Sequence, residues 1–181
     1  MHERTYPHFP YPPDLVSPDD EARVAAQLLL QPHQAPELLS RCSPEEFVCP
    51  LPRAIAAATQ ALRAQRQAPS LLAIERWVAD NPDYPSFATD ELTSVTDIIV
   101  REPLCDSAIR PSVAALRSAE AIRALARQRE VARVCASARG RMGQATCAVE
   151  LLKQIRREVD RLLASWAPPV RAPRLPNVLK R

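Results

Sequence analysis

Glycine occurs only twice in this chain of 181 residues, at Gly140 and Gly143. Nucleotide-binding turns need more: a P-loop requires G-x-x-x-x-G-K-[ST], and a Rossmann turn requires G-x-G-x-x-G. No lysine follows either glycine. The sequence therefore excludes ATP hydrolysis by the usual P-loop route. No Ser/His/Asp, Cys/His or paired-carboxylate set stands out either, so we expect no catalytic residues, no cofactor and no enzyme activity.

The remaining composition favours helix. β-Branched and aromatic residues are sparse, and Ala, Leu, Arg, Glu and Gln dominate. The 19 prolines cluster at the two ends and between the apolar periodic runs. No apolar stretch approaches the ~20 residues of a membrane span, and the opening MHERTYPHFPYPP lacks the apolar segment of a secretory signal. We predict an all-α protein located in the cytoplasm.

The five cysteines, at positions 42, 49, 105, 135 and 147, form no CxxC pair. A zinc site would need close ligand pairs, whereas His2, His8 and His33 are scattered through loop-like sequence. We therefore expect thiols that are buried or half-buried, and no metal site, including at Cys42 and Cys49.

Charge is distributed unevenly along the chain. Residues 1–100 carry 7 basic and 14 acidic side chains, a balance of −7, and residues 101–181 carry 17 basic and 7 acidic ones, a balance of +10. This asymmetry indicates two surfaces with different partners. Solvated arginine faces that reflect a GC-rich coding bias are an equally good explanation.

Helix-start signals divide the first hundred residues. Ser17 is placed as the N-cap of a helix that Pro32 ends, and Asp19, Asp20 and Glu21 complement the positive end of that helix. Further helices are expected at about residues 36–41, 52–64, 71–81 and 87–100. Their inward-facing positions are Val24, Leu28, Leu29, Ile55, Leu62, Leu71, Ile74, Trp77, Val78, Leu92, Val95, Ile98 and Ile99.

The stretch CSPEEFVCPLPRAI, residues 42–55, joins two of these helices. Ser43 caps a helix of one or two turns, with Glu46 three residues on as a capping box requires. Phe47 is the apolar anchor of this short helix, and Pro50 and Pro52 are expected to break it.

The last third predicts two long helices. The first covers about residues 107–138, Gly140 ends it in the left-handed conformation, and Thr146 caps the second. In the second helix a heptad seam follows steps of 3, 4, 3 and 4 through Leu152, Ile155, Val159, Leu162 and Trp166. We predict self-association through this seam; in the alternative, the seam packs the hairpin on its own bundle.

These segments define four parts. Residues 1–16 form an extended arm rich in proline and aromatics, and residues 17–104 form a globular helical head. Residues 105–166 form an αα-hairpin, and residues 167–181 form a basic, proline-rich tail. The fold class is therefore all-α, a small globular helical bundle followed by a long hairpin.

The order of elements resembles the N-terminal domain of replicative helicases of the DnaB family, over roughly residues 12–166. Pro12-Pro13 precede VAAQLLLQP, with Ala26 where the family has glycine. The family's Ser-Pro-Glu-Asp-Phe motif matches Ser43, Pro44, Glu45, Glu46 and Phe47, followed by Pro50 and Arg53, with Pro52 at the family's histidine. SAIRPSVAALRSAEAIRALARQ and LPNVLKR echo later segments of the family, the second being the start of its linker helix.

The resemblance implies a head with a protruding hairpin, pairing of hairpins into a collar, and binding to primase. It implies a non-catalytic interaction and oligomerisation module of DNA replication that contacts a primase, helicase or helicase loader. An arginine face on the first hairpin helix, consisting of Arg123, Arg127, Arg129 and Arg133, would meet an acidic partner surface. Two alternatives remain: nucleic-acid binding by the basic hairpin, and a truncated helicase remnant.

Overall fold

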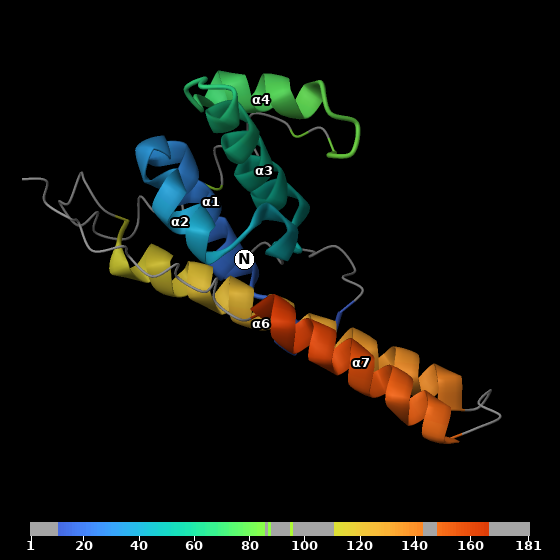
Figure 1. The fold of residues 1–181 in the computed structure, drawn as a ribbon. Helices are drawn as coiled ribbons and strands as arrows, with labels where there is room; N and C mark the ends of the chain where they lie inside the picture. Colours follow the sequence, from blue (N-terminus) through green and yellow to red (C-terminus); the bar gives the residue numbers. More distant parts are fainter. Residues whose placement is uncertain (1–10, 86, 88–94, 96–110, 143–147, 167–181) are drawn as a thin grey trace, which may run out of the picture. The chain divides into compact units, whose positions relative to one another are not determined.

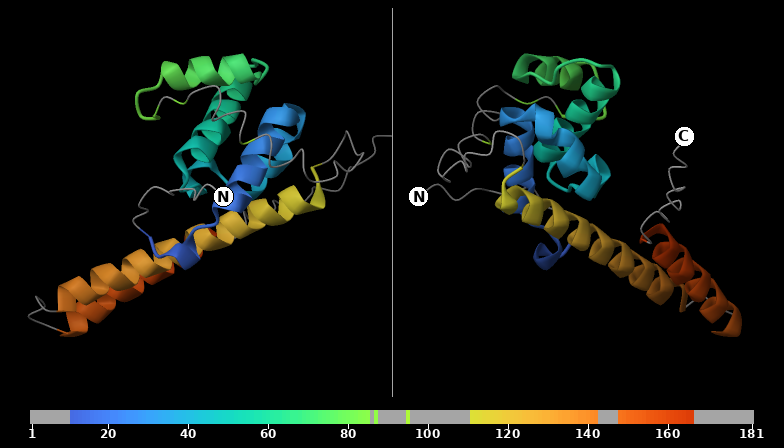
Figure 2. Two further views of the ribbon diagram at one scale, coloured as in Figure 1. Left: turned by 180° about the vertical axis from the view of Figure 1, so that it is seen from behind. Right: turned by 60° about the vertical axis from the view of Figure 1, so that its left-hand side comes forward.

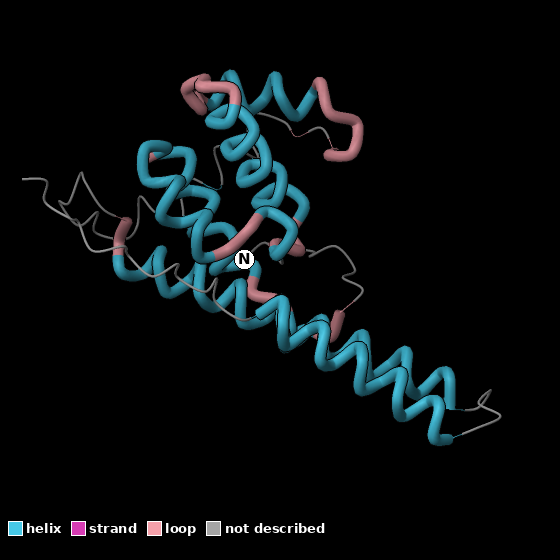
Figure 3. Tube along the Cα trace, viewed as in Figure 1, coloured by secondary structure: helices cyan, strands magenta, loops and turns pink. Residues whose placement is uncertain are grey.

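A computed structural model describes residues 11–85, 87, 95, 111–142 and 148–166. These residues form helices and loops, and none of them is in a strand (Figure 3). The predicted all-α class is confirmed. The chain divides into two compact units, residues 1–129 and residues 130–181. This division lies inside a helix, whereas the sequence placed the start of the hairpin at residue 105.

The first unit contains the helical head (Figure 1). Its elements are η1 (Pro13–Leu15), α1 (Pro18–Leu30), η2 (Pro32–Gln34), α2 (Ala35–Arg41), η3 (Pro44–Glu46), α3 (Pro50–Ala64), α4 (Leu71–Ala79) and the beginning of α6 (Val113–Met142). The helix expected at residues 87–100 and the extended arm before residue 11 lie outside the described residues, apart from Phe87 and Val95.

The core of this unit is built from one face of each helix. Small side chains on α1 and α3 let these two helices approach closely. Helix α6 also contributes small buried side chains, Ala115 and Ala119, to this core. The buried set comprises Val24, Ala25, Ala26, Leu28, Ala35, Leu38, Cys42, Phe47, Ala54, Ile55, Ala56, Ala58, Leu62, Ile74, Val78, Val95, Ala115, Ala119 and Ile122. Among the residues predicted to face inward, Leu29 and Trp77 are only partly buried, and Leu71 is exposed.

The junction at residues 43–49 has the predicted cap but not the predicted break. The Ser43 N–H donates to the Glu46 carboxylate at 2.7 Å, as in a capping box. Phe47 is only 2% exposed and belongs to the core. Pro50 and Pro52, however, lie in the first turn of α3 and do not stop a helix. First-turn residues have no intrahelical acceptor for their N–H groups, so proline costs nothing there.

The described part of the second unit contains two helical segments. The first is the end of α6, residues 130–142, and the second is the whole of α7 (Ala148–Trp166), which runs beside it (Figure 2). Gly140 lies within α6 and has no positive φ, so the prediction that it ends the helix is wrong. The helix continues to Met142, and space around Gly140 would accommodate a Cβ. The turn at residues 143–147, including the expected cap Thr146, is outside the described residues.

Candidate interaction surfaces

The predicted seam of α7 separates into two rows in the structure. Ile155 and Leu162 are partly buried, as is Trp166, whereas Leu152 is 64% and Val159 is 40% exposed. Residues seven apart share a line along a helix, and a step of three residues rotates the side chain by about 60° away from that line. The stripe is therefore wider than one neighbouring helix covers. We define the outward row as Leu152, Val159 and Leu163. Leu163 is 56% exposed and is not part of the predicted heptad seam.

The inward side of α7 packs within its own unit. Leu151 of α7 and Ala138 of α6 are the buried apolar side chains of the described part of this unit. Arg141 donates to the Glu158 carboxylate at 2.9 Å, and this hydrogen bond lowers the pKa of Glu158. An ion pair thus joins the two helices of the hairpin, while the outward row of α7 stays exposed.

The four arginines of the predicted partner-binding face do not share one environment. Arg129 is only 6% exposed: its guanidinium donates to the carbonyl of Leu15 at 2.8 Å and to the carbonyl of Glu46. It also lies 5.6 Å from the centre of the Tyr11 ring. The prediction that Arg129 meets a partner is therefore wrong, because the side chain is buried inside the head.

The other three arginines differ in accessibility. Arg123 donates to the Ser40 carbonyl at 3.3 Å and lies 3.5 Å from the Glu46 carboxylate. Arg127 is partly buried and has an interaction within the chain. Arg133 has a side chain 70% exposed and pairs with Glu130 at 2.8 Å. Of the predicted set, Arg133 is thus the residue whose accessibility best suits contact with a partner.

Glu21 has a role that the sequence did not indicate. We explained Asp19, Asp20 and Glu21 together by the helix dipole, but Glu21 is buried. Its carboxylate accepts the N–H of Val48 at 3.0 Å and that of Cys49 at 2.7 Å. Burial raises the pKa of Glu21 more than these hydrogen bonds lower it. Glu21 lies 27 residues before Val48 in the sequence, so no local signal links it to the junction at residues 43–49.

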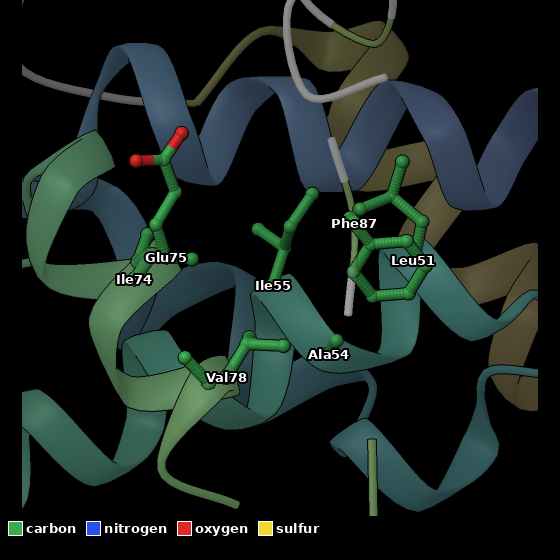
Figure 4. A pocket seen from close by; sticks show the side chains of 8 residues that line it. Leu51, Ala54, Ile55, Ile74, Glu75, Val78 and Phe87 are labelled. Atoms are coloured by element: carbon green, nitrogen blue, oxygen red, sulfur yellow. The ribbon is translucent and has the colours of Figure 1, made fainter. Parts of the chain in front are cut away.

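A small pocket opens between α3 and α4 in the head (Figure 4). Its volume is about 60 Å³, and it is lined by Leu51, Ala54, Ile55, Ile74, Glu75, Val78, Ala79 and Phe87. Apolar side chains form most of the wall, and the Glu75 carboxyl group is the ionisable group of the lining. Oε1 of Glu75 is buried without a hydrogen-bond partner. No sequence pattern predicts this pocket.

In the described ranges, no group of three or more His, Cys, Asp or Glu side chains is placed to hold a metal ion. The helices in the same ranges include none with the length and apolar character needed to cross a bilayer.

No protein-family model and no curated protein matches the chain. Solved structures do match. The N-terminal domain of DnaB helicase from Mycobacterium tuberculosis aligns with a TM-score of 0.65 at 15% sequence identity, covering 83% of this chain and 99% of that one. The chain has the DnaB N-terminal fold. The resemblance drawn from the proline-flanked junction at residues 42–55 is confirmed at the level of fold, including an all-α head followed by two paired helices.

Proposed function

We propose that this chain is a non-catalytic module that self-associates through its hairpin and binds a replication protein: a primase, a helicase or a helicase loader. Its place of action would be the cytoplasm. The fold shared with the N-terminal domain of a DnaB helicase supports the proposal. The single observation that carries it is the outward row of α7, Leu152, Val159 and Leu163, which the hairpin leaves exposed.

The three side chains of the outward row are large enough to stabilise an interface. Burying a leucine or valine removes apolar surface from water and is worth roughly 1.5–3 kcal/mol. Contiguous exposed apolar surface commonly marks a protein interface. A second copy that brings the same row would cover both rows at once, as a two-fold symmetric contact does. Primase, helicase or loader would then bind the assembled hairpins.

Self-association is tested by light scattering coupled to size exclusion. Wild type at ~100 μM should be a dimer or larger, since an interface worth about 8 kcal/mol has a Kd near 1 μM. Changing Leu152 and Leu163 together to glutamate should give a monomer with unchanged helicity. The matched control Leu72→Glu places a charge at a leucine of the head that is 74% exposed, and should leave the oligomer intact. A wild type that is monomeric at ~100 μM would contradict self-association.

The partner is tested by crosslinking and pull-down from the native host. Recovery of a primase, helicase or loader with wild type, and its loss with the monomeric double variant, supports binding by assembled hairpins. Equal recovery by both would show that assembly is not required.

Nucleic-acid binding is the second candidate, favoured by the charge of the second unit. Its described residues carry seven basic and four acidic side chains. Binding to phosphates would weaken steeply as salt rises. Trp166 is the single aromatic residue among these described positions. One aromatic side chain gives little support for stacking of single-stranded bases. Electrophoretic shift of a 30-nucleotide strand at two salt concentrations distinguishes this candidate from the first.

A further inference from the structure

A groove lies between the two helices of the hairpin, within the second unit. Its lining includes Arg133, Val134 and Ser137 of α6 and Glu158, Arg161 and Leu162 of α7. Its volume is about 330 Å³, whereas an engineered cavity that holds benzene measures about 150 Å³. The groove therefore has room for about two side chains of another polypeptide.

The acidic side chains in the described part of this unit are already paired. Glu130 pairs with Arg133 at 2.8 Å, Glu158 with Arg141 at 2.9 Å, Glu150 with Lys153 at 3.3 Å and Asp160 with Arg156 at 3.8 Å. Three of the seven described bases, Arg139, Arg157 and Arg161, are left without an ion pair to any described residue. Of these three, Arg161 lines the groove.

Positive charge is in excess at the groove. A hydrogen bond from Arg141, together with the charges of Arg141, Arg161 and Arg133, lowers the pKa of Glu158. These three guanidiniums thus lie around one carboxylate, and Glu130 supplies the second carboxylate of the lining. Three positive charges against two negative ones leave one guanidinium, that of Arg161, able to bind an anion.

The lining favours a carboxylate of a protein as that anion. A guanidinium binds a carboxylate through two parallel hydrogen bonds. Val134 and Leu162 line the same groove, and their apolar surface complements an apolar side chain beside the carboxylate. A nucleic-acid strand fits less well, because its charge repeats at every nucleotide and would bring further phosphates towards Glu130 and Glu158.

We propose that this groove binds a segment of a partner protein in which an aspartate or glutamate stands beside an apolar residue, with the carboxylate on Arg161 and the apolar side chain on Val134 and Leu162. The proposal rests on the proposed function, since it gives the chemistry of a partner that the hairpin binds. The groove is separate from the outward row of α7. Arg161 follows Leu152 by nine residues, which rotates its side chain by about 180° around the helix.

The test begins with a phage library of random peptides of about twelve residues, selected against the full chain at pH 7. Peptides that bind wild type should be enriched in an acidic residue next to an apolar one, and Arg161→Gln should select no such pattern. The tightest peptide is then synthesised with its acid and with the matching amide, and both forms are titrated by fluorescence anisotropy. Removing the charge should weaken binding about tenfold, as expected for a hydrogen bond to a charged group.

A double-mutant cycle assigns that loss to Arg161. Arg161→Gln should weaken binding of the acidic peptide about tenfold and leave binding of the amide peptide unchanged, so the two changes are not additive. Arg157→Gln is the matched control, since Arg157 is also without a described ion pair but lies outside the groove lining. It should change the affinity by less than about twofold. Methyl resonances of Val134 and Leu162 should shift when the peptide binds.

Four results would overturn the proposal. The first is the absence of acidic enrichment in the selected peptides, and the second is an additive cycle. The third is displacement of the peptide by a 30-nucleotide strand in a manner that depends on Arg161, which would assign the groove to nucleic acid. The fourth is a monomeric Arg161→Gln variant, which would assign it to a second copy. Peptide binding should persist in the Leu152→Glu, Leu163→Glu double variant, so a failure of self-association is measured separately.

Discussion

The guanidinium of Arg129 donates to the carbonyl oxygen of Leu15 at 2.8 Å, across a sequence separation of 114 residues. The same side chain donates to the carbonyl of Glu46. One arginine of α6 thus secures both the segment before α1 and the junction before α3. These bonds are part of the head's stability and are not available to a partner.

Replacing Arg129 with methionine should lower the free energy of unfolding by about 2 kcal/mol, because two part-buried carbonyl acceptors lose their charged donor at roughly 1–3 kcal/mol each. Arg133→Met is the matched control one turn later on the same helix, and at an exposed position it should change stability by less than about 0.5 kcal/mol. Urea unfolding followed by circular dichroism measures both. Equal effects of the two substitutions would contradict the buried role of Arg129.

Phe47→Ala should destabilise the protein by about 3–5 kcal/mol, the usual result of removing a buried aromatic side chain. The ring is 2% exposed and packs in the core of the head. Chemical denaturation provides the measurement, with the exposed Leu72→Ala as control. If the midpoint is unchanged, Phe47 is not an anchor of the head.

Glu21 should make stability depend on pH. Burial raises the pKa of its carboxyl group in the folded state above the ordinary value of 4.5, so the folded protein holds this proton more tightly than the unfolded chain. The resulting stabilisation is fully present below pH 4.5 and is lost as pH rises through the folded-state pKa. Relative to wild type, Glu21→Gln should therefore gain stability between pH 4 and pH 7. The free energy of unfolding of both proteins, measured across this pH range, tests the prediction. The same dependence on pH in both proteins would contradict a raised pKa of Glu21.

The cysteines should differ sharply in reactivity. Burial raises the pKa of the Cys42 thiol to about 12 and also raises that of Cys49, while Cys135 is exposed. Thiolate is the reactive form, so buried protonated thiols react slowly. In a background with Cys105→Ser and Cys147→Ser, Ellman's reagent should modify one thiol in the native protein and three in denaturant. Rapid modification of more than one native thiol would show that the head opens readily.

Much of the head was predictable because its signals are local. Proline at a first turn, serine before it and apolar residues at helical spacing fix α1, α2 and α4 within a few residues. The cap of α4 is an example: the Ser70 hydroxyl accepts the N–H of Ala73 at 3.2 Å. Pro50 and Pro52 were misread because proline both ends helices and begins them, and the choice depends on where the neighbouring N–H groups find acceptors.

The candidate surfaces were less predictable because they depend on what lies opposite each residue. Arg129 and Arg133 are one turn apart and alike in sequence, yet one is buried and the other is exposed. A heptad count grouped Leu152 with Ile155, although a rotation of about 60° separates an exposed row from a packed one. The Glu75 pocket has no sequence signature at all, since it forms where α3 meets α4.

The contribution of α6 to the head has a consequence for synthesis on the ribosome. Ala115, Ala119 and Ile122 complete a core whose earlier members include Val24, Ile55 and Ile74, and Arg129 bonds to carbonyls 114 and 83 residues earlier. The nascent chain must therefore expose an unfinished apolar surface until residue 129 has emerged. Contacts so distant in sequence slow folding, and partly built cores are prone to aggregate. Truncation before this point would leave a polypeptide that chaperones must hold.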